Sequence, residues 1–306
     1  MEQPPLHLAN TDDYDSQTSG HQAHPTGDAM TRRDGLGAHQ GSPTGQAHKA
    51  TVWPTAITAT TDERVFVRGT ALDEAIGRDS FPAMLLLLWR GDSATQEEAD
   101  LLGACLVASI DHGPLSPSAL VTRTIASTRA APMSGLAGGI LAFSDLHGAV
   151  VSRAMRILAG APANGDVEAW AEEVFDTERA AGRRLPGIGH RWHRRDLRAE
   201  RLLEVAAPLS DGRCEAAVRA LATRVSRHSG NPEPVNIDGA LAVALTALRL
   251  EPAYGDFLFA IARSFGLAAH YVEERTRERP MRTIDPTVAQ YDGVEVPDFE
   301  SQEADE

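Results

Sequence analysis

The sequence predicts an all-α protein, and two observations support this class. Apolar residues recur every three to four positions in most segments between residues 70 and 279, which is the spacing of amphipathic helices. Only one stretch alternates apolar and polar residues as a half-buried strand does. With 306 residues and 42% hydrophobic content, the chain can bury one sizeable core or two small domains that share an interface.

The individual elements follow from these two patterns. The alternating stretch DERVFVRG, residues 62–69, predicts a short strand or one arm of a hairpin. Residues 70–92 predict a short helix, a turn and a core helix. Further helices are predicted over residues 94–113, 118–128, 132–148, 167–184, 236–250 and 256–279.

Both ends of the chain are predicted to be disordered. Residues 1–50 are rich in Gly, Ser, Thr, Asp, Gln and His, so they cannot bury enough apolar surface to offset the entropy of ordering. Five of the eleven histidines lie there, either as an incidental feature of low complexity or as a metal-binding tail. The last fifteen residues carry seven acids and no base, which is typical of an acidic flexible tail, assigned to residues 293–306.

Composition excludes several classes of function. The formal charge of -14 argues against nucleic acid or an anionic membrane as a partner, whereas a small anion is still compatible. The single lysine, Lys49, precedes the predicted helices, which excludes Schiff-base and P-loop chemistry there. Cys105 and Cys214 lack the spacing of a disulfide framework or a zinc site, and no metal is expected. Because no signal peptide or membrane span is predicted, we expect a cytoplasmic protein.

Positive charge is concentrated at one turn, LPGIGHRWHRRDLR, residues 185–198. Gly187 and Gly189 precede His190, and such paired glycines indicate a sharp bend or a close approach to a ligand. Four arginines follow at the start of a predicted helix, where cations are locally unfavourable, so they indicate a bound anion: Arg191, Arg194, Arg195 and Arg198. A solvated basic face paired with the preceding Glu-rich helix is the alternative. A metal site at His190 and His193 would lack a third ligand.

Four further residues differ from ordinary packing residues. Asp238 lies in the first turn of a long apolar helix, where a carboxylate either caps the helix or is available as a base. His112 and His147 each end an apolar helix and precede a glycine, as capping residues or as parts of a site. Arg263 interrupts an apolar run, so its guanidinium either extends to the surface or is paired in a cleft, and we expect the cleft.

Six segments in this order resemble the citrate synthase superfamily, over residues 65–292. They are RGTALDEAI with FPAMLLLLWRGD, DHGPLSPSALVTRTIAST, DLHGAV, PGIGHRWHRRDLRAE, NIDGALAVAL and FAIARSFGLAAHYVEER. The resemblance implies a homodimer with a large helical domain, residues 51–147 and 247–292, and an inserted small helical domain, residues 148–246. It also implies that the basic turn binds a tricarboxylate and the phosphates of coenzyme A.

The resemblance implies roles for individual residues. His147 would polarise the acetyl thioester carbonyl, His190 would protonate the keto oxygen of oxaloacetate, and Asp238 would remove the methyl proton. The carboxylates of oxaloacetate or citrate would be bound by His112, Arg198, Arg263 and Arg279. The coenzyme A phosphates would be bound by Arg191, Arg194 and Arg195. No cofactor is implied beyond the coenzyme A thioester, which is a substrate.

Two activities of the family compete. The DHGP and NIDGA segments resemble citryl-CoA lyase and the corresponding module of ATP-citrate lyase, whereas a histidine at position 147 is more typical of citrate synthase. The sequence therefore predicts citryl-CoA lyase, with citrate synthase of the tricarboxylic acid cycle as the alternative. A 2-methylcitrate synthase ranks below both. A non-catalytic member that binds citrate or coenzyme A is a further hypothesis, and the presence of all three candidate catalytic residues argues against it.

Overall fold

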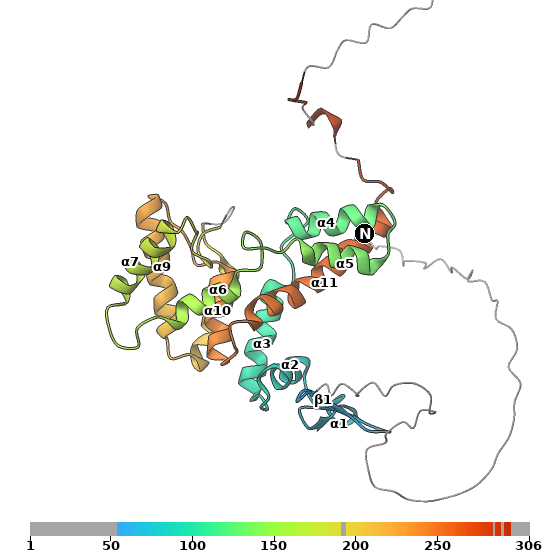
Figure 1. Ribbon diagram of the computed structural model, residues 1–306, viewed down its shortest axis with the longest axis horizontal. Coiled ribbons are helices and arrows are strands. Elements are labelled where there is room, and N and C mark those ends of the chain that lie inside the picture. Colours follow the sequence, from blue (N-terminus) through green and yellow to red (C-terminus); the bar gives the residue numbers. More distant parts are fainter. Residues whose placement is uncertain (1–53, 191–193, 284, 289–290, 295–306) are drawn as a thin grey trace, which may run out of the picture. The chain divides into compact units, whose positions relative to one another are not determined.

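Helices dominate the part of the chain that the structure describes, which is residues 54–190, 194–283, 285–288 and 291–294 of this computed structural model (Figure 1). The predicted all-α class is confirmed. The helices are α1 (Leu72–Ala75), α2 (Phe81–Arg90), α3 (Gln96–Ser109), α4 (Pro117–Ser127), α5 (Pro132–Leu141), α6 (Val151–Ala159), α7 (Val167–Ala180), α8 (Leu197–Ala206), α9 (Arg213–Ser229), α10 (Ile237–Ala247) and α11 (Tyr254–Arg277), with short 3-10 turns η1 (Ala207–Leu209) and η2 (Pro286–Val288).

The strand predicted within residues 62–69 is confirmed as the centre of a small antiparallel sheet. The order is β1-β2-β3, formed by β1 (Thr58–Thr60), β2 (Val65–Val67) and β3 (Thr70–Ala71). Phe66 lies opposite Ala59 on one side and Ala71 on the other. The two residues between β2 and β3, Arg68 and Gly69, have φ of 49° and 83°, as a tight two-residue hairpin requires.

Two predicted helices end earlier in the structure. The helix expected over residues 94–113 ends at Ser109, and the one expected over 132–148 ends at Leu141. His112 and His147 therefore lie in loops beyond the helix ends and do not cap them. The turn that carries His147 is closed by two backbone hydrogen bonds between Ser144 and His147, of 2.8 and 2.9 Å.

Two helices were not predicted individually, α6 and α9. The buried face of α6 consists of Val151, Ala154, Met155 and Leu158, which are spaced by three or four positions. The helical pattern was therefore present in the sequence, in a segment shorter than those assigned.

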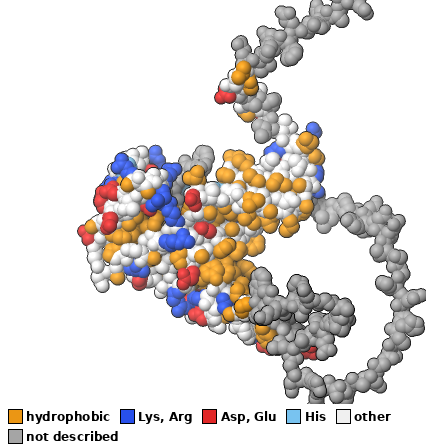
Figure 2. Space-filling model, viewed as in Figure 1, with side chains coloured by type: hydrophobic (Ala, Val, Ile, Leu, Met, Phe, Trp, Pro, Cys, Tyr) orange, Lys and Arg blue, Asp and Glu red, His pale blue; other side chains and the backbone are white. Residues whose placement is uncertain are grey.

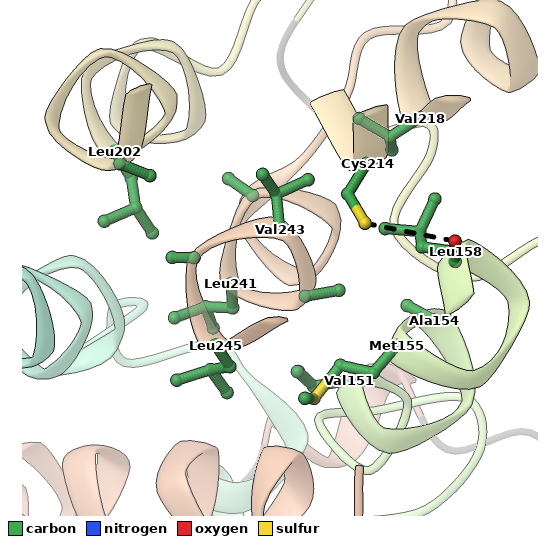
Figure 3. Packing of buried hydrophobic residues seen from close by; sticks show 14 of the residues in the cluster. Val151, Ala154, Met155, Leu158, Leu202, Cys214, Val218, Leu241, Val243 and Leu245 are labelled. Carbon is green, nitrogen blue, oxygen red and sulfur yellow. Dashed lines mark hydrogen bonds between the residues drawn. The ribbon is translucent and has the colours of Figure 1, made fainter. Parts of the chain in front are cut away.

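The core is built around α10, which is buried on nearly every side. Residues Ile237 and Gly239 to Leu245 are all buried, and α10 packs against α3, α6, α8, α9 and α11. Figure 3 shows Leu241, Val243 and Leu245 of α10 among side chains of α6, α8 and α9. Cys214 belongs to this core, with its Sγ 3.9 Å from the Leu158 carbonyl oxygen. Because α10 is fixed from several directions, the residues at its start are held in place as well.

Several sequence predictions concern parts that the structure does not describe. Residues 1–50 lie outside the described residues, and so do residues 295–306 of the predicted acidic tail. The described residues of the chain fall within one compact unit, and the domain boundaries drawn at residues 147 and 246 stay a prediction. No helix among the described residues has both the length and the apolar character needed to cross a membrane.

Candidate active site

The basic turn is attached to the start of α10 through its two glycines. The Asn236 N–H donates to the Gly187 carbonyl (3.0 Å), and the Asn236 side-chain amide donates to the Gly189 carbonyl (2.8 Å). Gly187 has φ +81°, and a Cβ on it would lie only 2.6 Å from the Cα of Gly239. The glycines thus allow direct contact between two backbones, and this contact fixes the position of His190 relative to α10.

Asp238 is not the cap of α10. The capping role belongs to Asn236, whose Oδ1 accepts from the backbone N–H groups of Asp238 (2.9 Å) and Gly239 (3.3 Å). The Asp238 Oδ1 atom is buried and has no hydrogen-bond partner among the described residues. Burial raises the pKa of this carboxyl to about 6, although the nearby Arg263 and Arg198 act in the opposite direction. The carboxylate is therefore available to react near neutral pH.

Arg263 lies inside the protein, as expected, and not at the surface. It is 2% exposed, its Nε donates to the Ser109 carbonyl (3.1 Å), and its guanidinium carbon lies 4.8 Å from the centre of the Phe259 ring. Burial lowers its pKa, against the favourable charges of Asp111 and Asp238. The Nη1 atom is buried without a partner. A buried cation with an unused donor suits an anionic ligand.

His112, Arg198 and His190 lie next to one another. The Arg198 Nη1 atom is 3.4 Å from His112 Nδ1, and the rings of His112 and His190 meet edge to face with centroids 5.6 Å apart. Burial lowers the pKa of His112 to about 4, with further contributions from Arg198, Arg263 and His190. His112 is thus a neutral ring at physiological pH. The loop that follows α3 is brought here beside the turn at His190 and the start of α8, although it lies far from them in sequence.

Asp196 is a candidate site residue that the sequence pattern did not single out. It is 2% exposed, and its two oxygens accept from Arg198 Nε (3.0 Å) and Nη2 (3.0 Å). It also caps α8 by accepting from the Arg198 N–H. Its position at the start of a helix, directly before the Leu-Arg pair, was the signal that would have found it. Two N–H groups of the Arg198 guanidinium, on Nε and Nη2, are therefore bound to Asp196, and Nη1 is directed at His112.

The side chain of His147 lies beside the first turn of α4. Its Nε2 accepts from the Ser118 backbone N–H (3.3 Å) and is 3.0 Å from Ser118 Oγ. Because a backbone N–H only donates, the neutral ring carries its proton on Nδ1. The neighbouring Gly148 is packed so closely on Phe259 that a Cβ would lie 2.5 Å from that ring, which places the turn beside α11.

The remaining arginines of the basic turn differ in their surroundings. Arg195 is exposed and forms a two-point ion pair with Glu200 (3.0 and 2.6 Å). Glu200 lies in the first turn of α8, and not in the preceding Glu-rich helix α7. Arg194 and Arg195 line one side of a groove of about 820 Å³ between α8, α9 and the loop that follows α9. Arg191 and His193 lie outside the described residues.

Arg279 belongs to the segment that follows α11. It is exposed, two residues beyond the end of α11. No hydrogen bond or ion pair joins it to the other site residues of the described chain. Its neighbourhood is fixed by Glu274, a 1% exposed carboxylate that accepts from Arg123 and Arg282. The role of Arg279 at the site stays a prediction.

The arrangement brings together a carboxylate with a raised pKa, a buried arginine and the imidazoles of His112 and His190, which are held by separate loops. A carboxylate of this kind exchanges protons with carbon or oxygen atoms near neutral pH. Arg263 and Arg198 provide positive charge for carboxylate ligands. Among the described residues, no group of three or more His, Cys, Asp or Glu side chains is arranged to bind a metal ion.

Comparison with known proteins identifies the family of this chain. A family model described as the citrate synthase C-terminal domain matches residues 28–284. Putative citrate synthase 2 of Mycobacterium tuberculosis is 29% identical over 199 residues, which cover 63% of this chain and 52% of that protein. ATP-citrate synthase subunit 1 of Sordaria macrospora is 29% identical over 212 residues, which cover 63% of this chain and 31% of that protein. The chain thus spans about half the length, or less, of these curated relatives.

Solved structures show the same relationship. The citryl-CoA lyase of Hydrogenobacter thermophilus superposes with a TM-score of 0.73 at 31% sequence identity, covering 82% of this chain and 98% of that chain. The citrate synthase of Thermoplasma acidophilum, in complex with carboxymethyl coenzyme A and oxaloacetate, has a TM-score of 0.58 at 24% identity and shares the fold. Because the family model spans most of the sequence and the fold agrees, the chain belongs to the citrate synthase family.

Proposed function

We propose that this protein makes or breaks the carbon–carbon bond between acetyl-CoA and oxaloacetate through citryl-CoA, and that cleavage, the citryl-CoA lyase reaction, is its main activity. The observation that carries the proposal is the Asp238 carboxyl at the start of α10, whose Oδ1 atom is buried without a hydrogen-bond partner among the described residues and whose pKa is raised to about 6. Asn236 already caps this helix, so the helix end does not require Asp238.

The proposed reaction involves proton transfer at two atoms of the substrate, the citryl hydroxyl oxygen and the enolate carbon. In cleavage, His190 takes the proton of the citryl hydroxyl, the carbon–carbon bond breaks, and the electron pair moves to the acetyl-CoA enolate. The acid form of Asp238 then protonates the enolate carbon to give acetyl-CoA, and oxaloacetate leaves. In synthesis the steps reverse, and Asp238 removes the methyl proton. His147, with its proton on Nδ1, donates to the thioester oxygen on which the enolate charge develops.

The charges of the site suit a substrate with several carboxylates. We assign Arg263, Arg198 and His112 to the carboxylates of oxaloacetate or citrate, because Arg263 has an unused buried donor. The phosphates of coenzyme A are assigned to Arg191, Arg194 and Arg195. Arg195 would exchange its partner Glu200 for a phosphate. The reaction needs no cofactor besides the coenzyme A thioester.

The direction of the reaction distinguishes the two candidate activities. The likeness to the Hydrogenobacter citryl-CoA lyase extends over 98% of that protein at 31% identity, which favours cleavage. The presence of a histidine at position 147, which is more typical of citrate synthase, favours synthesis, in the tricarboxylic acid cycle, as the second candidate. A silent, ligand-binding role is disfavoured because Asp238, His190 and His147 are all present.

We also propose a cytoplasmic homodimer. Hydrophobic side chains are frequent where α4, α5 and α11 lie (Figure 2). Several of the large ones are exposed in the single chain: Leu120, Val121, Met133, Ile140, Leu141, Phe265 and Val272. A contiguous apolar face of this kind is typical of a subunit interface. In such a dimer, Arg279 would reach the site of the partner subunit.

One pair of assays tests the proposed activity. The purified protein is incubated with citryl-CoA, and separately with acetyl-CoA and oxaloacetate, while free thiol and oxaloacetate are followed. We expect citryl-CoA to yield oxaloacetate and acetyl-CoA without release of thiol. Release of thiol from acetyl-CoA and oxaloacetate, at a rate above that of citryl-CoA cleavage, would assign the protein as a citrate synthase. The absence of turnover in both assays would refute catalysis.

A further inference from the structure

His112 has one ring nitrogen directed at a group that can only donate. The Nη1 atom of Arg198 lies 3.4 Å from His112 Nδ1. A guanidinium has five N–H donors and no acceptor, and it keeps its proton at any physiological pH. For this contact to be favourable, Nδ1 must hold a lone pair. In a neutral imidazole the proton then lies on Nε2.

The guanidinium itself is fixed by Asp196. The carboxylate of Asp196 accepts from Arg198 Nε and Nη2, both at 3.0 Å, in the two-point arrangement that matches a guanidinium best. Asp196 is 2% exposed and also caps α8 through the Arg198 N–H. A carboxylate anchored in this way leaves the guanidinium little rotational freedom, so Nη1 remains directed at His112.

The other charged groups around His112 also favour its neutral form. Arg263 of α11 and Arg198 of α8 carry positive charge toward the ring, and His190 meets it edge to face at 5.6 Å. Asp196 acts in the opposite direction, and it is already paired with Arg198. Together with burial, these groups lower the pKa of His112 to about 4.

We propose that the Asp196–Arg198 pair fixes the tautomer of His112, so that the ring offers Nε2–H as a hydrogen-bond donor to the bound substrate. Asp196 and Arg198 are then positioning residues for His112. A neutral donor of known direction can bind a carbonyl or carboxylate oxygen of the keto acid without adding a proton to it. Asp196 uses two of the five N–H donors of Arg198, so the guanidinium can orient His112 and still donate to a carboxylate of the substrate.

The tautomer is measurable without any substrate. Long-range proton–nitrogen NMR spectra of the full-length, ¹⁵N-labelled protein distinguish the two neutral forms and the cation, and His112→Gln identifies the signals of His112. We expect the Nε2–H form in the wild-type protein at neutral pH. A doubly protonated ring, or the Nδ1–H form, would overturn the proposal. The proposal rests on the proposed function only for the identity of the substrate, so failure of the enzymatic assay would not alter this result.

Variants separate positioning from a merely structural role. Asp196→Asn can still cap α8 but loses the charge that holds the guanidinium, and Arg198→Lys keeps the charge but loses the planar fork. We expect both to give a mixture of His112 tautomers, and the KM for the carboxylate substrate to rise about tenfold, as expected for a hydrogen bond to a charged group. The control is Arg201→Gln, an exposed arginine of α8 that pairs with Glu204. Unchanged His112 signals in both site variants would refute the proposal that Asp196 and Arg198 fix the tautomer, and so would equal changes in the control.

Discussion

The replacement Asp238→Asn tests the central residue of the proposed site. Asn has nearly the same size, and the cap of α10 is made by Asn236, so the helix should form as before. What changes is the buried carboxyl, which is neutral below its pKa of about 6 and charged above it. A general base or acid removed in this way typically costs 10²–10⁴-fold in rate. We therefore expect kcat to fall by roughly that factor.

The same variant has a pH-dependent effect on stability. Relative to the ordinary value of 3.8, the raised pKa means that the folded state holds its proton more tightly than the unfolded state. The wild-type protein therefore loses stability as the pH rises from about 4 through 6, by about 3 kcal/mol in total. Asn does not ionise. The difference in free energy of unfolding, variant minus wild type, should therefore increase by roughly 2 kcal/mol between pH 4 and pH 8.

Chemical denaturation at a series of pH values, with activity measured on the same samples, checks both expectations. Unchanged turnover would remove Asp238 from the reaction. A stability difference that does not vary with pH would mean that the carboxyl is solvated in the folded protein and that its pKa is not raised. Retained stability with lost turnover, and a widening difference toward high pH, would support the reasoning.

Three further changes probe the surroundings of the site. Gly187→Ala should lower the free energy of unfolding by about 2 kcal/mol or more and displace His190, because the new Cβ would lie 2.6 Å from the Gly239 backbone at a residue with positive φ. Chemical denaturation and kcat measurements check this. Wild-type stability and kcat would contradict the close approach. Glu274→Gln should cost about 3 kcal/mol at neutral pH, because two arginines lose a buried carboxylate. Since the hydrogen bond from Arg282 lowers the pKa of Glu274, the deficit should shrink as the pH falls below 4.5, which urea denaturation would show. Hybrid dimers of one Arg279→Ala chain and one Asp238→Asn chain should show about half of the wild-type activity per hybrid dimer if Arg279 acts on the partner's site, and none if it acts within its own chain.

Much of this protein was determined by local sequence pattern. Amphipathic spacing gave most of the helices, because the burial of one helix face is a property of a single segment. The hairpin strand, the apolar helix after Asn236 and the unusual position of Arg263 were also recognisable, since each depends on a few neighbouring residues. Helix ends were less accurate: the helix before His147 stops at Leu141, and nothing within that apolar segment shows where its packing partners end.

Other features were decided only by the tertiary structure. The sequence left Asp238 between a cap and a base, and the choice depends on Asn236 and on burial by other helices. The glycines of the basic turn could have approached a ligand, but they approach the backbone of α10 at Gly239. Asp196 gained its importance from a histidine 84 positions earlier in the chain, because a buried carboxylate orients a guanidinium only when folding brings its partners within hydrogen-bond distance. Residue types and spacing therefore determined which groups were available, and long-range packing determined which of them meet.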